Sequence, residues 1–143
     1  MQNEMLDIVD YDGEGYKPLV DFGTWRVAFL RYIDELIPEN IHQLERHVQT
    51  DEVFVLLEGQ AVLFLGEGEQ EITGLFNFEM EPGKLYNVRK NAWHGCVLSR
   101  DATILLVENK DTGKENTDYI RLESAQKERL VEISGMHIED WKK

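Results

Sequence analysis

The sequence predicts an all-β domain, a sandwich or a barrel, with a single helix near its C-terminal end. Short segments rich in aromatic and β-branched residues follow one another from residue 24 to residue 122, and turn residues separate them. Only residues 124–134 (SAQKERLVEIS) have a helical pattern. There, Ser124 is the expected cap, and Leu130 and Ile133 are expected to face the body of the protein.

The strand segments are recognised by their composition and by the turns that bound them. The segment at 75–83 alternates apolar and polar residues, and the segments at 24–33, 52–59, 60–66 and 102–109 are largely apolar. Gly59 lies between two apolar runs, which indicates either a hairpin or a bend. The expected strands cover residues 24–33, 52–59, 60–66, 75–83, 84–99, 102–109 and 116–122.

The N-terminal residues differ from the rest of the chain. Residues 7–21 are polar and contain Gly13, Gly15 and Pro18, so we expect a loosely structured lead-in. The expected organisation is a lead-in at 1–23, a barrel at 24–123, and a helix with a tail at 124–143.

Composition excludes several classes of function. The 143 residues are enough for one domain, and they carry a formal net charge of −13. This charge repels nucleic-acid phosphates and anionic membrane surfaces. The one cysteine, Cys96, cannot form an internal disulfide, and no apolar run approaches the roughly 20 residues that cross a bilayer. We therefore expect a cytoplasmic protein that binds a small molecule rather than nucleic acid or a membrane.

Two strand segments are apolar on both of their faces. Residues 53–57 and 61–65 lack the alternation expected of a sheet with one solvated face. Both faces must therefore be covered, either by the ends of the chain or by a second subunit. We expect a homodimer.

A set of polar residues around the first of these strands suggests a metal site. His47 and Gln49 are two residues apart, so in a regular strand their side chains leave the same face. Glu52 joins them only if a turn or bulge intervenes at residues 50–51. His94 follows some forty residues later. Imidazoles and a carboxylate suit Zn, Mn, Fe, Ni or Cu, so His47, Gln49, Glu52 and His94 are the candidate ligands of one divalent metal.

Other residues near these positions suggest contacts with a substrate. Tyr86 and Trp93 are candidate pocket residues, although core aromatics have the same pattern. Arg46 is able to bind a substrate carboxylate. His94 and Glu52 are also the candidate catalytic residues for proton transfer.

These motifs resemble those of the cupin superfamily. The resemblance rests on the pair His47 and Gln49, on Glu52 directly before VFVLLEG, and on Pro82-Gly83 followed by His94. It covers roughly residues 40–110, and Gln49 stands where a second histidine is usual. The resemblance implies a small jelly-roll barrel that holds a metal or ligand inside, and a metal-assisted lyase, isomerase or dioxygenase if the protein is an enzyme. A small polar acid or a sugar-like molecule is the expected ligand.

Two alternative functions remain open. LERH (residues 44–47) and LYNVRKNAWHGCVL (residues 85–98) resemble segments of ureidoglycolate lyases, which release glyoxylate and urea. That resemblance implies that Arg46, Tyr86 and His94 surround the substrate. The other alternative is a non-catalytic, dimeric, ligand-sensing cupin.

Overall fold

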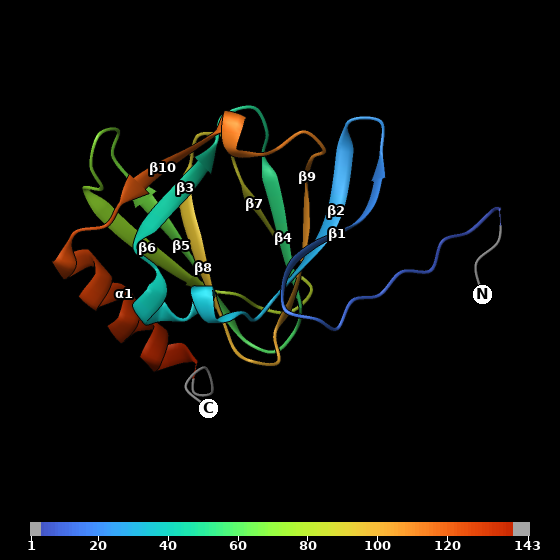
Figure 1. The fold of residues 1–143 in the computed structure, drawn as a ribbon. Helices are drawn as coiled ribbons and strands as arrows, with labels where there is room; N and C mark the ends of the chain where they lie inside the picture. The colour runs from blue at the N-terminus through green and yellow to red at the C-terminus, as the bar shows by residue number, and fades with distance from the viewer. Residues whose placement is uncertain (1–3, 139–143) are drawn as a thin grey trace.

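The computed structural model describes residues 4–138, which form two antiparallel sheets facing each other with one helix outside (Figure 1). This confirms the all-β prediction with a C-terminal helix. The elements are β1 (Gly15–Phe22), β2 (Trp25–Arg31), η1 (Asp34–Leu36), η2 (Pro38–Asn40), β3 (Gln43–His47), β4 (Glu52–Glu58), β5 (Ala61–Glu67), β6 (Gly74–Glu79), β7 (Leu85–Val88), β8 (Trp93–Leu98), β9 (Thr103–Asn109), η3 (Lys114–Asn116), β10 (Thr117–Arg121) and α1 (Ser124–His137).

Consecutive strands often lie in different sheets, as a jelly roll requires. The first sheet has the strand order β1-β2-β9-β4-β7 and the second has the order β10-β3-β8-β5-β6. The chain crosses between sheets at Gly59, so the apolar runs on either side of it form a bend and not a hairpin. Gly59 has φ of 76°, and a Cβ there would lie 2.6 Å from Ala102 Cα. Only glycine combines this backbone conformation with so close an approach.

The expectation of a loosely structured lead-in is wrong for residues 15–22. These residues form β1, which pairs with β2 through a turn at Gly23, where φ is 58°. β1 lies at the edge of its sheet, where Pro18 removes no essential ladder hydrogen bond, and the register shifts between Pro18 and Val20. The predicted barrel therefore begins one strand earlier than expected.

The protein has two hydrophobic cores. One fills the interior between the sheets and includes Phe54, Leu56 and Ile104. The other lies between the second sheet and α1, and it includes Leu130 and Ile133, which are 0% and 7% exposed as the helical pattern predicts. The N-cap is Glu123 rather than Ser124, because the Glu123 N–H donates to Gln126 Oε1 at 2.9 Å. The predicted tail beyond residue 138 lies outside the described residues.

The interior between the sheets is apolar at one end and polar at the other. Along β4, the inward residues run from Glu52 to Phe54 and Leu56, and along β9 they run from Ile104 through Leu106 to Glu108. Both strands therefore bring a carboxylate to the same end of the barrel. Within residues 4–138, no helix is long and apolar enough to cross a membrane.

The bend at Gly59 yields a stability prediction. Gly59→Ala should destabilise the protein by about 2–4 kcal/mol, because the left-handed conformation is costly for alanine and the new Cβ meets the Ala102 backbone. Gly23→Ala is the matched control. It also has positive φ but has no atom within 4 Å, and should cost about 1 kcal/mol. Urea unfolding measures both, and equal losses would contradict the role assigned to the close approach.

Candidate metal centre

Three strands from both sheets bring the central site residues together. His47 is the last residue of β3 and His94 lies in β8, the neighbouring strand of the same sheet. Glu52 is the first residue of β4 in the facing sheet, so it reaches the histidines across the barrel and not through a bulge within one strand. The two imidazole rings meet edge to face with their centroids 5.2 Å apart.

Glu52 accepts contacts from both rings through a single oxygen. Its Oε1 lies 3.1 Å from His47 Nε2 and 3.2 Å from His94 Nε2. All three side chains are buried, with exposed fractions of 8%, 3% and 6% for His47, His94 and Glu52. These three side chains thus expose little surface at the point where the two nitrogens and the oxygen converge.

The hydrogen bond of Nδ1 in each ring determines whether Nε2 presents a proton or a lone pair to Glu52. His94 Nδ1 lies 3.0 Å from the Ala92 carbonyl, which only accepts hydrogen bonds, so Nδ1 carries a proton. His47 Nδ1 lies 2.9 Å from Thr117 Oγ1 and donates to it in the corresponding tautomer. The neutral His94 ring therefore turns the lone pair of Nε2 toward Glu52, and the His47 ring does the same in the tautomer whose Nδ1 donates to Thr117. A lone pair that faces a carboxylate is favourable only if a proton or a metal cation lies between them.

Protonation is one way to supply that cation. Burial lowers the pKa of each imidazole, but the adjacent negative charge of Glu52 outweighs burial, so the pKa of both His47 and His94 is raised. Burial raises the pKa of Glu52, but the two imidazoles outweigh it and lower this pKa to about 2. Glu52 thus remains a carboxylate throughout the physiological pH range.

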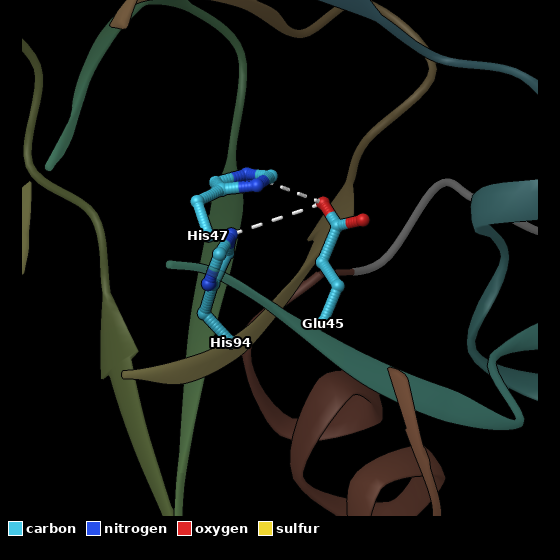
Figure 2. A group of neighbouring side chains, drawn as sticks. All are labelled: Glu45, His47 and His94. Atoms are coloured by element: carbon cyan, nitrogen blue, oxygen red, sulfur yellow. Dashed lines mark ion pairs between the residues drawn. The ribbon is translucent and has the colours of Figure 1, made fainter. Parts of the chain in front are cut away.

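Two further carboxylates lie beside the histidines. Figure 2 shows that Glu45 Oε1 points at both rings, and it lies 3.8 Å from Nε2 of His47 and of His94. Glu108 Oε2 approaches His47 Nε2, also at 3.8 Å. Neither residue belongs to the motifs of the sequence, although period-2 alternation indicates both of them. Glu45 precedes His47 by two residues in β3, and Glu108 follows the inward Leu106 by two in β9.

Glu108 is held by residues of the two neighbouring strands. Arg26 Nη2 donates to Glu108 Oε1 at 2.7 Å, and the Tyr16 hydroxyl donates to the same oxygen at 2.9 Å. Burial and the nearby charge of Glu52 raise the pKa of Glu108 despite these two donors. Burial and the charge of Glu108 also raise the pKa of Tyr16. No sequence pattern indicated Tyr16 or Arg26, because their role depends on the order of the strands.

Gln49 lies outside this group. β3 ends at His47 and residues 48–49 form a bend, so the same-face spacing of a strand does not extend to Gln49. Its side chain is exposed, and its Oε1 accepts a hydrogen bond from Asn116 Nδ2 at 3.3 Å. On the inward face of β3, Glu45 rather than Gln49 accompanies His47.

The structure also places Arg46, Trp93 and Tyr86 away from the site. Arg46 stacks on Trp93 with its guanidinium 4.3 Å from the ring centroid, and its side chain pairs with Asp118 and Glu69 on the outer side of the second sheet. Tyr86 packs at the apolar end of the interior, and its hydroxyl accepts from the Glu81 N–H at 2.9 Å. The set that the lyase resemblance implies, Arg46 and Tyr86 with His94, is therefore not assembled around one cavity.

The donors present fit a divalent transition metal. His94 Nε2 and Glu108 Oε2 are buried and have no hydrogen-bond partner among the described residues. Donors bound to one such metal at about 2.0–2.2 Å lie roughly 3.0–3.5 Å apart, which matches the separations of Glu52 Oε1 from the two histidines. Two groups of three residues have ligand atoms that all lie within 4.8 Å of one another. One group is Glu45, His47 and His94, and the other is His47, Glu52 and Glu108.

A cavity of about 540 Å³ opens onto this cluster. Its polar end contains the histidines, Glu52 and Glu108. Cys96 also lines it, but burial strongly raises the pKa of its thiol, so this residue contributes a packing surface rather than a nucleophile. The apolar wall consists of Leu30, Leu36, Ile41, Phe54 and Leu106.

The raised histidine pKa values predict how stability depends on pH. A histidine whose pKa is higher in the folded state than in the unfolded state stabilises the folded protein. This stabilisation is complete at pH values below the unfolded-state pKa of about 6.5, and it is lost as the pH rises through the folded-state pKa. The raised pKa of Glu108 acts in the same direction, and the lowered pKa of Glu52 matters only in acid. With chelator present, the free energy of unfolding should therefore fall as pH rises above about 6.5.

Urea unfolding across this pH range tests the expectation. Glu52→Gln should flatten the dependence, because it removes the charge that raises both histidine pKa values. Glu45→Gln is the matched control and should have a smaller effect, since Glu45 is 42% exposed and lies farther from the rings. Stability that rises with pH in the wild-type protein would refute the assignment.

Comparison with known proteins supports the fold. No protein-family model matches the sequence, and no curated protein matches it. Among solved structures, Streptomyces Pac13, described as a nucleoside dehydratase, is 13% identical with a TM-score of 0.54, over 80% of this chain and 85% of that chain. A cupin-2 domain protein from Shewanella frigidimarina is 14% identical with a TM-score of 0.50, over 70% and 85%. The protein therefore has the fold of the cupin superfamily, as its motifs predict.

Proposed function

We propose that this protein is a metal-dependent cupin that binds a small, uncharged, hydroxyl-bearing molecule in its barrel. The observation that carries the proposal is the convergence of two imidazole nitrogens and the Glu52 carboxylate at one buried point, where His94 Nε2 has no hydrogen-bond partner among the described residues. The adjoining cavity of about 540 Å³ is large enough for a small metabolite.

His47, His94 and Glu52 would hold the metal, with Glu45 or Glu108 as an additional oxygen ligand. Zn, Mn, Fe and Ni all accept such a set of nitrogen and oxygen donors. A divalent metal bound here would polarise a hydroxyl or carbonyl oxygen of the ligand. The contacts of Nδ1 in His94 with Ala92, and in His47 with Thr117, hold the rings in the orientation that this role requires.

The charge around the cavity favours an uncharged ligand over an acid, the other class that the sequence leaves open. Arg26 is a buried cation at this end, and its terminal nitrogens are engaged by Glu108 and by the carbonyls of Lys110 and Thr112, while its Nε has no hydrogen-bond partner among the described residues. The carboxylates of Glu45, Glu52 and Glu108 surround the same space. A divalent metal would offset this negative charge without leaving an excess of positive charge to attract an acid.

The remaining donors and acceptors suit hydroxyl groups. Glu108 Oε2 has no hydrogen-bond partner in the described part of the chain, and it can accept a hydrogen bond from a ligand hydroxyl or hold a proton for it. The apolar wall opposite, including Phe54 and Leu106, can pack against a ring. Among the predicted reaction classes, this favours a lyase or isomerase acting beside a polarised oxygen.

Metal binding provides the first test. Adding Zn, Mn, Fe or Ni to chelator-treated protein should raise the melting temperature, and a free metal concentration 100 times Kd should stabilise by about 2.7 kcal/mol. His47→Ala and His94→Ala should weaken binding by about a hundredfold or more, because each removes a ligand. Calorimetry measures the affinities.

Gln49→Ala is the matched control and should bind metal as the wild type does. A wild type that binds none of the four metals would refute the metal-dependent function. Weaker binding by Gln49→Ala than by His94→Ala would instead restore Gln49 as a ligand.

The charge of the ligand provides a second test. Uridine is a suitable neutral probe, because it is small and hydroxylated and because structures of Pac13 hold it. The metal-loaded protein should bind uridine at least about tenfold more tightly than uridine 5′-monophosphate, since the phosphate would face the buried carboxylates. Tyr16→Phe should preserve this order. Tighter binding of the monophosphate, measured by calorimetry, would show that the cavity accepts acids.

A further inference from the structure

The outer face of the first sheet is apolar across all five of its strands. In β2, Arg26 and Ala28 point into the barrel, so Trp25, Val27 and Phe29 point outward. The same alternation in β4 and β9 turns outward the residues on either side of the buried Phe54 and Leu106. This accounts for the strand at 53–57 being apolar on both faces.

Strand register aligns these outward residues into rows. Directly opposed residues of antiparallel strands share a face, so each row crosses the sheet from edge to edge. One row runs Val20, Val27, Val107, Val53 and Asn87, and the next runs Lys17, Phe29, Leu105, Val55 and Leu85. A third begins with Phe22 and Trp25, whose rings are 6.4 Å apart. We call this set of rows the outer apolar face.

The chain covers the corresponding face of its other sheet but not this one. α1 packs on the second sheet and buries Leu130 and Ile133 there, whereas no helix lies beside β1 and β2 (Figure 1). None of the outward valines and leucines in the two complete rows belongs to either hydrophobic core. Phe22 and Leu85 are 75% and 74% exposed, and residues 4–10 are exposed rather than packed over the face.

We propose that a second copy of this chain packs on the outer apolar face, sheet against sheet, to form a two-fold symmetric dimer. Five strands about 4.8 Å apart and six residues at about 3.3 Å each give a face of roughly 500 Å² in projection. That lies in the upper part of the roughly 300–600 Å² that the largest apolar patch of a monomer covers, and patches of this size are often functional. Side-chain relief brings the face toward the roughly 800 Å² that each partner buries in a stable complex.

Charge also favours a second copy as the occupant. The protein carries 28 acidic residues, yet the two complete rows contain no acid and only Lys17 at one end. Two chains of net charge −13 therefore meet with least repulsion at this face. Interdigitation of two apolar sheet faces is the packing of β-sandwiches, and a two-fold axis supplies both faces from one sequence.

Sedimentation analysis of the full-length protein tests the dimer. At micromolar concentration, the wild type should have twice the 16.7 kDa mass of one chain. Val107→Lys, at the centre of the face, and Leu85→Lys should each weaken association by about a hundredfold or more, because each buries an unpaired charge in the interface. Met136→Lys is the matched control on α1, where Met136 is 73% exposed, and should leave the dimer intact.

Leu85→Lys protects the test against misfolding, because the exposed Leu85 contributes little to the fold of one chain. Its thermal transition in the monomeric state should remain cooperative, and the monomer should still bind metal. A wild type that stays monomeric at all concentrations, or dimers that survive both Val107→Lys and Leu85→Lys, would overturn the proposal. Neither result would affect the proposed metal site.

Discussion

The arrangement of this protein depends on the Glu52 carboxylate, which is buried against two imidazoles from the opposite sheet. A lone carboxylate removed from water loses several kcal/mol of solvation, and the lone pair of the neutral His94 imidazole beside it would add to that cost. A cation shared among the three groups reverses the balance. Because Glu52 belongs to the first sheet, and His47 and His94 to the second, a cation held there would also join the two sheets at the polar end of the barrel.

The neighbouring strands compensate the charge that this arrangement creates. Val53 of β4 pairs with Val107 of β9, so Glu52 and Glu108 are brought close together on the inner face. Two adjacent carboxylates repel each other, and the pKa of Glu108 rises through burial and this repulsion. Arg26 stands directly opposite Glu108 in the β2–β9 register and forms an ion pair with it. The strand order thus places the Arg26 guanidinium beside the Glu108 carboxylate and offsets its charge.

Most of the fold, and part of the site, was predictable from local pattern. The short strands, a change of chain direction at Gly59 and the apolar face of α1 follow from periodicity and turn residues, whereas the choice of a bend over a hairpin at Gly59 does not. The approach of His94 to His47 was predictable only through the resemblance to cupins, since nothing local relates residues so distant in sequence. The alternation of side chains along a strand also predicts which neighbours of the histidines lie outside the site. If His47 and His94 face inward, then Arg46 and Trp93, one position away in each strand, must face outward.

Two features of the site depend on information that no local pattern contains. The point at which β3 ends decides whether Gln49 or Glu45 accompanies His47, and the exit of the chain toward the other sheet sets that point. The roles of Tyr16 and Arg26 depend on β1 and β2 lying beside β9, which is a property of topology. Spacing rules apply within a strand, so the residues they misplace are the ones that lie beyond its end.

The same strands serve both the candidate site and the outer apolar face. β4 turns Glu52 inward and Val53 outward, and β9 does the same with Glu108 and Val107. A rigid partner on the outer face would restrict the twisting of these two strands, and hence the position of both carboxylates relative to the histidines of the other sheet. The second sheet receives comparable support from α1. In a dimer, both sheets that supply site residues would therefore be packed on their outer faces. The second sheet, with the histidines, packs against α1 of the same chain, and the first sheet, with the carboxylates, would pack against the partner.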